Sequence, residues 1–244
     1  MIAAIARFCA LLLLVTGVKA QTLALPENLI DFRSDRGGDL LLESEAHEAY
    51  FPLASNFVTQ QNQAYCGVAS VVMVLNALGL PAPSVPEFDP YKTFTQANIL
   101  SEQTDAVLPR DTLAKIGMTL DQIGGILESY PVDAEVRHAA DSSVDQFRTE
   151  ASEYLGSPDR FVIVNYLRKA INQERGGHIS PLAAYDKDTD RFLILDVARY
   201  KYPPVWVATS DLFAAMNTPD SDNNNQTRGY VLISKTGGVP KALP

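Results

Sequence analysis

The first twenty residues constrain the fold of this chain most. Arg7 precedes an apolar run over residues 8–15, and Val18 and Ala20 are side chains permitted before a cleavage point after Ala20. This pattern is typical of a secretory signal, so we expect an exported protein, periplasmic or secreted; an uncleaved N-terminal anchor is the alternative. The apolar run is too short to cross a bilayer as an ordinary helix, and no later segment could do so.

Export would leave the chain with one thiol. The sequence holds two cysteines, and Cys9 lies within the predicted signal, which leaves Cys66 alone. An exported protein with a single cysteine forms no internal disulfide, so its fold must depend on a hydrophobic core. A chain of 244 residues with 46% hydrophobic residues has enough apolar surface for one. We therefore expect one folded domain over residues 21–244.

The charge balance excludes two classes of partner. After loss of the signal, 18 basic residues face 29 acidic ones. An acidic chain without a basic run repels nucleic acid and anionic lipid, so we expect no nucleic-acid binding and no membrane insertion after cleavage. The three histidines, His47, His138 and His178, are scattered. They form no Cys/His spacing typical of a zinc site, and we expect no resident metal or cofactor.

Hydrophobic patterning separates a helical first half from a strand-rich second half. Residues 66–79 are apolar on nearly every face and end in a glycine, which predicts a buried helix that begins at Cys66. Further helices are predicted over residues 39–50, 119–129, 143–155 and 211–216, with Asp39, Thr119, Ser143 and Ser210 as N-caps. Strands are predicted over residues 161–164, 178–185, 191–197, 205–207 and 230–233. This pattern favours an α+β fold of two lobes.

Cys66 is the first candidate for chemistry. The start of a helix carries free backbone N–H groups and the positive end of the helix dipole, and both favour a thiolate. A thiolate is a nucleophile. The alternative is an inert cysteine that fills the core, since free cysteines are commonly buried.

His178 and Asp196 flank a charged loop, residues 186–190, that predicts a hairpin. In the register that pairs Tyr185 with Arg191, His178 lies one diagonal step from Asp196. Both side chains are then on one face, within reach of a carboxylate–imidazole hydrogen bond. A slip of one residue would separate them. Asp196 follows an apolar run and needs a partner; a nearby Arg or Lys is the alternative to His178.

Acyl transfer from such a cysteine also needs a donor for the developing oxyanion. A side-chain amide just before the cysteine, together with the backbone N–H of the cysteine itself, would supply it. Gln60, six residues before Cys66, is the candidate. Gln61 and Gln63 are close by, and spacing alone does not choose among the three.

The order Gln, Cys at a helix start, distant His and then Asp resembles the papain-like arrangement. Local segments narrow the resemblance to the phytochelatin synthase family, which the chain resembles from about residue 40 to 235. The matching segments are 64–70, 76–78, 177–181, 194–199, 201–204 and 228–234. The resemblance implies a papain-like two-lobed fold, with a helical N-terminal lobe and an antiparallel-sheet C-terminal lobe.

The resemblance also implies roles for single residues. Cys66 is expected to be the nucleophile, His178 the general acid and base, Asp196 the group that orients His178, and Gln60 the oxyanion donor.

Four further residues are expected around the substrate. Asn165 and Arg228 match positions that hold the glutamyl end of the acyl group, and an arginine suits a carboxylate. Arg199 and Lys201 would line an acceptor site, or are solvated surface charges.

The implied reaction is cleavage of the Cys–Gly amide of glutathione. The γ-glutamylcysteinyl group on Cys66 then passes to water or to a second glutathione or other γ-glutamyl peptide, giving phytochelatin in the second case. The chain holds no cysteine after Cys66, so it resembles the short bacterial forms and we expect hydrolysis to dominate. Cd²⁺ or Zn²⁺ would enter as a metal–glutathione thiolate. The alternatives are a papain-like peptidase for glutathione S-conjugates or other small peptides, and a non-catalytic thiol- or metal-binding protein.

Overall fold

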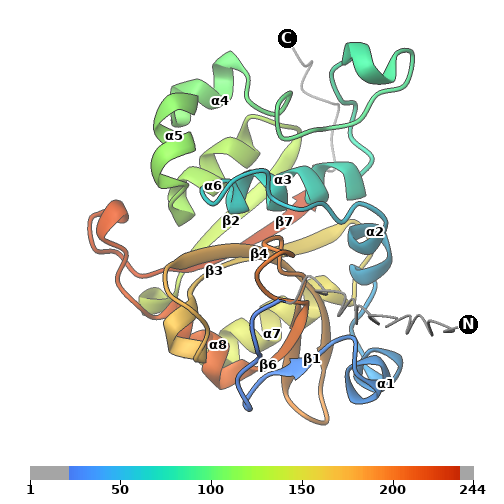
Figure 1. The fold of residues 1–244 in the computed structure, drawn as a ribbon, viewed down its shortest axis with the longest axis vertical. Helices are drawn as coiled ribbons and strands as arrows, with labels where there is room; N and C mark the ends of the chain where they lie inside the picture. Colours follow the sequence, from blue (N-terminus) through green and yellow to red (C-terminus); the bar gives the residue numbers. More distant parts are fainter. Residues whose placement is uncertain (1–21, 237–244) are drawn as a thin grey trace, which may run out of the picture.

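The structure is a computed structural model, and it describes residues 22–236 (Figure 1). The predicted signal over residues 1–20 lies outside the described residues. The helices are α1 (Asp35–Glu43), α2 (Tyr50–Ser55), α3 (Cys66–Ala77), α4 (Glu102–Val107), α5 (Arg110–Ile116), α6 (Leu120–Glu128), α7 (Val144–Leu155) and α8 (Thr209–Met216). The strands are β1 (Ile30–Asp31), β2 (Val132–His138), β3 (Arg160–Leu167), β4 (Gly177–Asp186), β5 (Arg191–Ile194), β6 (Val205–Ala208) and β7 (Gly229–Lys235).

An antiparallel sheet forms the centre of the described residues. It has seven strands there, in the order β1-β6-β5-β4-β3-β7-β2. Figure 1 shows α3 with α4, α5 and α6 above the sheet, and α7 and α8 below it; α3 contacts β4, α6 contacts β2, and α7 and α8 both contact β3. The predicted α+β class is therefore confirmed, with a helical lobe of α2–α6 and a sheet lobe.

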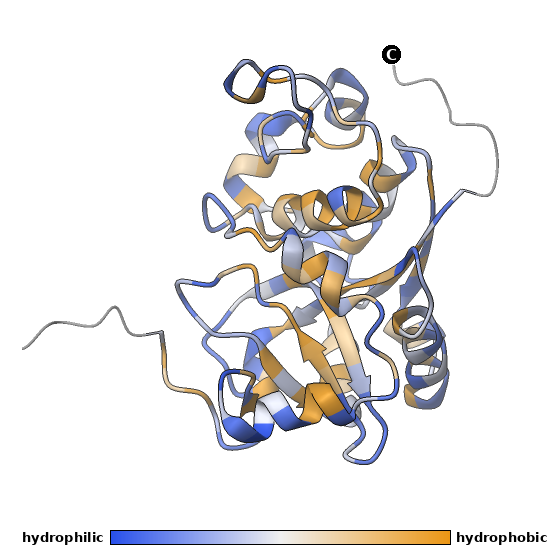
Figure 2. Cartoon of the chain, turned by 90° about the vertical axis from the view of Figure 1, so that its right-hand side faces the viewer, coloured by the Kyte–Doolittle hydropathy of each residue, from blue (hydrophilic) through white to orange (hydrophobic). Residues whose placement is uncertain are grey.

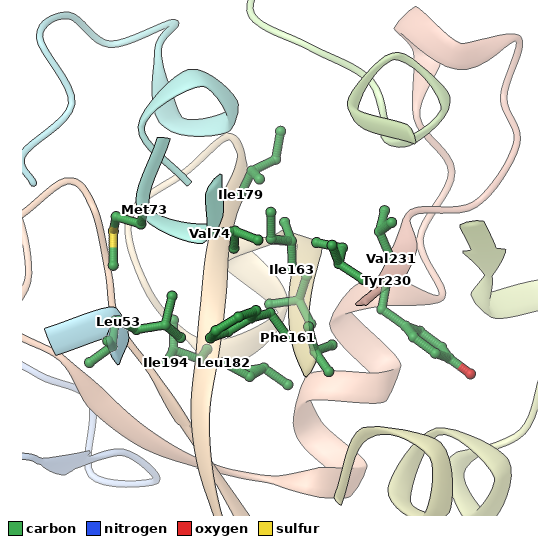
Figure 3. Packing of buried hydrophobic residues seen from close by; sticks show 14 of the residues in the cluster. Leu53, Met73, Val74, Phe161, Ile163, Ile179, Leu182, Ile194, Tyr230 and Val231 are labelled. Carbon is green, nitrogen blue, oxygen red and sulfur yellow. The ribbon is translucent and has the colours of Figure 1, made fainter. Parts of the chain in front are cut away.

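The core lies where α3 meets the sheet. Figure 2 shows strongly apolar strands, and Figure 3 shows Met73 and Val74 of α3 among strand residues such as Ile163 and Leu182. All four are fully buried, at 0% exposure. Burying side chains of this size contributes about 1.5–3 kcal/mol each. The core therefore holds α3, and with it Cys66, against the strands.

Local signals in the sequence located three helices correctly. The helix predicted at Cys66 begins there as α3. Thr119 caps α6 in a capping box with Gln122, and Ser143 caps α7 by accepting a hydrogen bond from the Gln146 N–H at 3.1 Å. The capping signals of α6 and α7 are reliable because donor and acceptor lie within three residues of each other.

The helix predicted over residues 39–50 was wrong in both bounds. Ser34, not Asp39, is the N-cap of α1: its Oγ accepts from the Gly37 N–H at 3.1 Å, and α1 ends at Glu43. The chain leaves the helix there because Ala46 exchanges two backbone hydrogen bonds with Tyr185 of β4. Sheet pairing thus overrides the local helical pattern.

The predicted cap of the last helix was also wrong. Ser210 is the second residue of α8, which begins at Thr209. The Thr209 N–H and hydroxyl both donate to the Asp190 carbonyl, at 2.9 and 3.0 Å. Anchoring to the loop between β4 and β5 therefore sets the start of α8 two residues earlier than predicted.

A tight approach between β2 and β7 leads to a stability prediction at Gly229. A Cβ atom at Gly229 would lie 1.9 Å from the carbonyl oxygen of Arg137, which belongs to the backbone of the paired strand. We expect Gly229→Ala to lower the free energy of unfolding by about 3 kcal/mol, because the two strands must move apart. Urea denaturation measures this value.

Gly38→Ala is the matched control for this change. A Cβ at Gly38, within α1, meets nothing within 4 Å in the described structure. Alanine there should leave stability unchanged or raise it by about 0.5–1 kcal/mol. Equal urea midpoints for the two variants would contradict the argument.

Candidate active site

Cys66 is the first residue of α3 and is 8% exposed. Burial raises the pKa of its thiol, while the backbone N–H groups of Ile179 and Gly67 and the charge of Arg168 lower it. The helix start therefore acts in the expected direction, but burial is the larger effect and the net shift is upward. A thiolate would form here when a neighbouring base takes the proton.

His178 and Asp196 are hydrogen-bonded. Nε2 of His178 lies 2.8 Å from Oδ1 of Asp196, and the two side chains are 5% and 0% exposed. Burial lowers the pKa of His178, while the Asp196 carboxylate opposes this shift. Because Asp196 accepts at Nε2, Nδ1 is the ring nitrogen left for proton transfer.

Asp196 stays ionised although it is fully buried. Burial raises its pKa, but the charges and hydrogen bonds of His178 and Arg168 outweigh burial and lower the pKa to about 2. Arg168 Nη2 lies 2.8 Å from Oδ2 of Asp196. Both partners that the sequence left open for this aspartate, a histidine and a basic side chain, are therefore present.

A β-bulge brings His178 and Asp196 together. The predicted pairing of Tyr185 with Arg191 was wrong, because Asp186 pairs with Arg191. This register is one residue from the predicted one and would put the two side chains on opposite faces. The register shifts between Leu182 and Ala184, and Leu182 then pairs with Ile194 in the predicted register.

Beyond the bulge, Ser180 links β4 to the segment that carries Asp196. Its Oγ lies 3.0 Å from Nε2 of His178 and accepts from the Val197 N–H at 3.3 Å.

Cys66 and His178 both line a cavity of 120 Å³. Its lining also includes Asn165 and Arg228, the two residues predicted at the glutamyl end of the substrate. Strand pairing explains this meeting, because Asn165 of β3 pairs with Ile179 of β4 on one side and with Gly229 of β7 on the other. Four of the predicted residues thus surround one space.

Two carboxylates in the same lining were missed by the sequence analysis. Asp220 and Asp222 come from the polar loop between α8 and β7. Asn223 in this loop donates to Asp121 Oδ2 of α6 at 3.0 Å, and His138 Nδ1 lies 2.5 Å from the Thr227 carbonyl. The loop is therefore anchored beside the cavity.

Arg228 lines the cavity, and its Nε and Nη2 form one edge of the guanidinium. Nη1 donates to Thr218 Oγ1 at 3.2 Å and to the Pro219 carbonyl at 2.6 Å, and Nη2 lies 3.3 Å from Oδ1 of Asp220. Nε is buried and forms no hydrogen bond with any residue from 22 to 236. A buried donor without a partner is costly, so a ligand acceptor would suit this edge.

Gly177 allows this arrangement by having no side chain. A Cβ atom there would lie 3.3 Å from Nε of Arg228.

A second cavity of 430 Å³ adjoins the first and shares His178 in its lining. Gln60 and Lys201 line this second cavity, while Gln63 lines both. Gln60 is 4% exposed, and its Nε2 donates to the Asn62 carbonyl at 2.7 Å and to Tyr200 Oη at 3.1 Å. The choice of oxyanion donor between Gln60 and Gln63 stays a prediction.

The other glutamine and the other predicted acceptor residue line neither of these two cavities. The Gln61 backbone N–H donates to Gln96 Oε1 at 2.9 Å. The Arg199 guanidinium lies over the ring of Phe57, 4.6 Å from its centroid, and Arg199 is exposed. Of the two acceptor candidates, Lys201 is the one that lines a cavity with His178.

Within residues 22–236, no group of three or more His, Cys, Asp or Glu side chains could hold a metal ion. No helix in the same range is long and apolar enough to cross a membrane.

A cysteine at a helix start, with a histidine on an antiparallel strand and an aspartate just after the neighbouring strand, is the arrangement of a papain-like α+β fold. The sequence profile of the family described as phytochelatin synthase matches residues 20–230. The chain therefore belongs to the phytochelatin synthase family.

Curated relatives agree with this family. Glutathione gamma-glutamylcysteinyltransferase 1 of Lotus japonicus is 36% identical over 217 residues, which cover 88% of this chain and 42% of the relative. Proteins with this name from Arabidopsis thaliana (number 1) and Schizosaccharomyces pombe are 32% and 29% identical, over 88% and 86% of this chain and 43% and 50% of their own lengths. The chain thus spans half or less of the length of these relatives.

Proposed function

We propose that this chain is an acyltransferase that cleaves the Cys–Gly amide of glutathione through an acyl-enzyme on Cys66. The observation that carries the proposal is the single cavity lined by Cys66, His178, Asn165 and Arg228. It combines a nucleophile and a base with groups that suit an amino-acid end. The names of the relatives, all glutathione gamma-glutamylcysteinyltransferases, supply the substrate class.

The charges of the cavity suit the γ-glutamyl end of glutathione, which carries an α-carboxylate and an α-ammonium group. Nε and Nη2 of Arg228 would donate to the two carboxylate oxygens, as in other side-on arginine–carboxylate pairs. Asp220 and Asp222 line the same cavity and would accept from the ammonium group. The scissile amide would then extend towards Cys66.

Acylation begins with a neutral pair. Burial raises the pKa of Cys66 and lowers that of His178, and both shifts favour the neutral thiol and imidazole over the ion pair. His178 takes the thiol proton as Sγ attacks the cysteinyl carbonyl carbon, and the oxyanion accepts from the Cys66 backbone N–H and from the side chain of Gln60 or Gln63. His178 then returns the proton to the amide nitrogen, the C–N bond breaks, and glycine leaves.

Deacylation uses the same base. His178 removes a proton from water or from the α-amine of a second γ-glutamyl peptide, the new bond forms at the thioester carbonyl, and Cys66 leaves as the thiol. The second cavity, with Lys201 in its lining, is the proposed acceptor site. An open cavity also admits water, which favours hydrolysis. Cd²⁺ or Zn²⁺ would enter as part of a glutathione thiolate substrate.

We further propose that the enzyme works outside the cytoplasm after cleavage following Ala20. N-terminal sequencing of the protein from its native host checks this: Gln21 is the expected first residue, and an intact Met1 would contradict it.

Mass spectrometry of the purified chain with glutathione tests the reaction. We expect release of glycine and a γ-glutamylcysteinyl adduct that peptide mapping places on Cys66. Adding Cd²⁺ shows whether longer products appear. Cys66→Ala is the control, because it removes the thiol proposed as the nucleophile.

The outcomes separate the candidate functions. Glycine release that survives in Cys66→Ala would overturn the mechanism. Turnover of glutathione S-conjugates without turnover of glutathione would indicate the conjugate-specific peptidase. Absence of an adduct with both substrates, combined with tight stoichiometric binding of Cd²⁺ alone in calorimetry, would indicate a binding protein.

A further inference from the structure

Arg168 is a buried charge that the proposed reaction does not yet use. Its side chain is 3% exposed, and its Nη2 donates to Oδ1 of Asp196 at 2.9 Å while lying 2.8 Å from Oδ2. Removing a guanidinium from water is expensive and needs compensation by a partner of opposite charge. Asp196, at 0% exposure, is that partner.

The guanidinium is held in one orientation. Nη1 donates to Oε1 of Gln173, and the plane lies over the ring of Tyr202, with Cζ 5.2 Å from the ring centroid. Glu174 N–H in turn donates to Tyr202 Oη at 2.8 Å. Contacts on two sides therefore fix how the guanidinium meets the carboxylate.

Arg168 also begins the segment that leads to His178. It is the first residue of the 3₁₀ turn Arg168–Ile171 between β3 and β4. Its backbone N–H donates at 3.0 Å to the carbonyl of Gly176, two residues before His178. Arg168 therefore binds both halves of the pair. Its backbone holds the start of β4, which carries His178, and its side chain holds Asp196.

We propose that Arg168 is a positioning residue of the active site: it holds the Asp196 carboxylate ionised and aligned on His178 whether or not His178 is protonated. The inference rests on the proposed function only for its kinetic consequence. Without Arg168, a buried carboxylate beside a neutral imidazole would be an uncompensated charge whenever His178 has given up its proton. With Arg168, the carboxylate keeps a cation on one side throughout the reaction.

The same cation acts on the nucleophile. Burial is the main influence on Cys66 and raises its pKa, while the charge of Arg168 lowers it. The loss of a nearby positive charge raises the pKa of a neighbouring acid. Removing Arg168 should therefore move thiolate formation at Cys66 to higher pH.

Two variants separate charge from geometry. Arg168→Gln removes the cation, and we expect alkylation of Cys66 by iodoacetamide at pH 7 to slow about tenfold, which corresponds to a shift of about one pH unit. Arg168→Lys keeps the cation without the planar fork. It should keep the wild-type pH profile of alkylation within about threefold, while kcat for glycine release falls about tenfold and KM stays the same.

Lys169→Gln is the matched control, because it removes an exposed cation from the same turn. Thermal unfolding checks that each variant is folded. If Arg168→Gln does not fold, the kcat of Arg168→Lys tests the proposal by itself. Alkylation uses no glutathione, so it tests Arg168 even if the proposed substrate is wrong. The proposal would be overturned if both variants kept the wild-type alkylation rate and the wild-type kcat. An unchanged kcat in Arg168→Lys would also overturn it.

Discussion

Asp196→Asn is expected to slow acylation of Cys66 by about 10³–10⁴-fold, because an amide reverses the polarity that His178 meets. The Asp196 carboxylate accepts from His178 Nε2 at 2.8 Å and from the Ala198 N–H at 2.9 Å, both at Oδ1. An asparagine has only one side-chain oxygen. Its NH₂ group would therefore face either His178 or Arg168, and both of these side chains are donors. If the oxygen turns to Arg168, the imidazole loses its acceptor and takes the other tautomer.

The same change should also destabilise the fold. Arg168 would remain buried without its counter-charge, and breaking a buried pair in this way costs about 3–5 kcal/mol. The pKa of Asp196 is about 2 in the folded protein, below the ordinary aspartate value. A lowered folded pKa contributes stability that is fully present above about pH 4, and it is lost as the pH falls through about 2.

Glycine release and urea denaturation between pH 7 and pH 2 measure both effects. The wild type should lose stability below about pH 4 more steeply than Asp196→Asn, which lacks this titrating group. Asp133→Asn, at an exposed position on β2, is the matched control. Acylation by Asp196→Asn within tenfold of the wild type, together with wild-type acid unfolding, would show that the carboxylate neither orients His178 nor balances Arg168.

The parts of the fold that the sequence predicted well are those with local causes. α3, α6 and α7 begin where a buried apolar run or a capping serine or threonine predicts them. β2 also had a local signal that the sequence analysis did not use, since Val132, Ala134 and Val136 alternate with charged residues. Alternation of this kind is typical of an edge strand with one buried face.

The active site depended on contacts that are distant in sequence. The hairpin predicted His178 and Asp196 on one face, but the structure reaches that result by a shifted register followed by a bulge. A bulge leaves little trace in a sequence pattern. Arg168 is one of many basic residues, and its contact with Asp196 spans 28 positions, so the sequence could say only that some Arg or Lys was a possible partner.

The loop between α8 and β7 shows the same limit. Its acidic and amide residues are typical of polar loops, so Asp220 and Asp222 carry no local signal of a site. The hydrogen bonds from Asn223 to Asp121 and from the Arg228 N–H to the Thr218 carbonyl fold the loop back onto the cavity. Only the folded chain therefore reveals carboxylates opposite Arg228.

Arg228→Gln should lower kcat/KM for glutathione by about 10²–10³-fold. Arg228 lines the cavity with Cys66, and its buried Nε has no hydrogen-bond partner among residues 22–236. A substrate α-carboxylate at this edge would form two charge-assisted hydrogen bonds, each contributing about 1.5–3 kcal/mol. Glutamine supplies neither the charge nor the paired donors.

A substrate analogue makes this prediction specific. Glutathione with its γ-glutamyl α-carboxylate converted to an amide should be a poor substrate for the wild type, and Arg228→Gln should scarcely distinguish it from glutathione. Arg160→Gln is the control. It removes a half-exposed cation at the start of β3, away from the cavity residue Asn165, and should keep the wild-type preference for glutathione over the amide analogue. Arg228 also holds Thr218 and Pro219, so thermal unfolding must show that the loop is intact. Equal losses with both substrates in a folded Arg228→Gln would mean that the guanidinium supports the loop and does not bind the carboxylate.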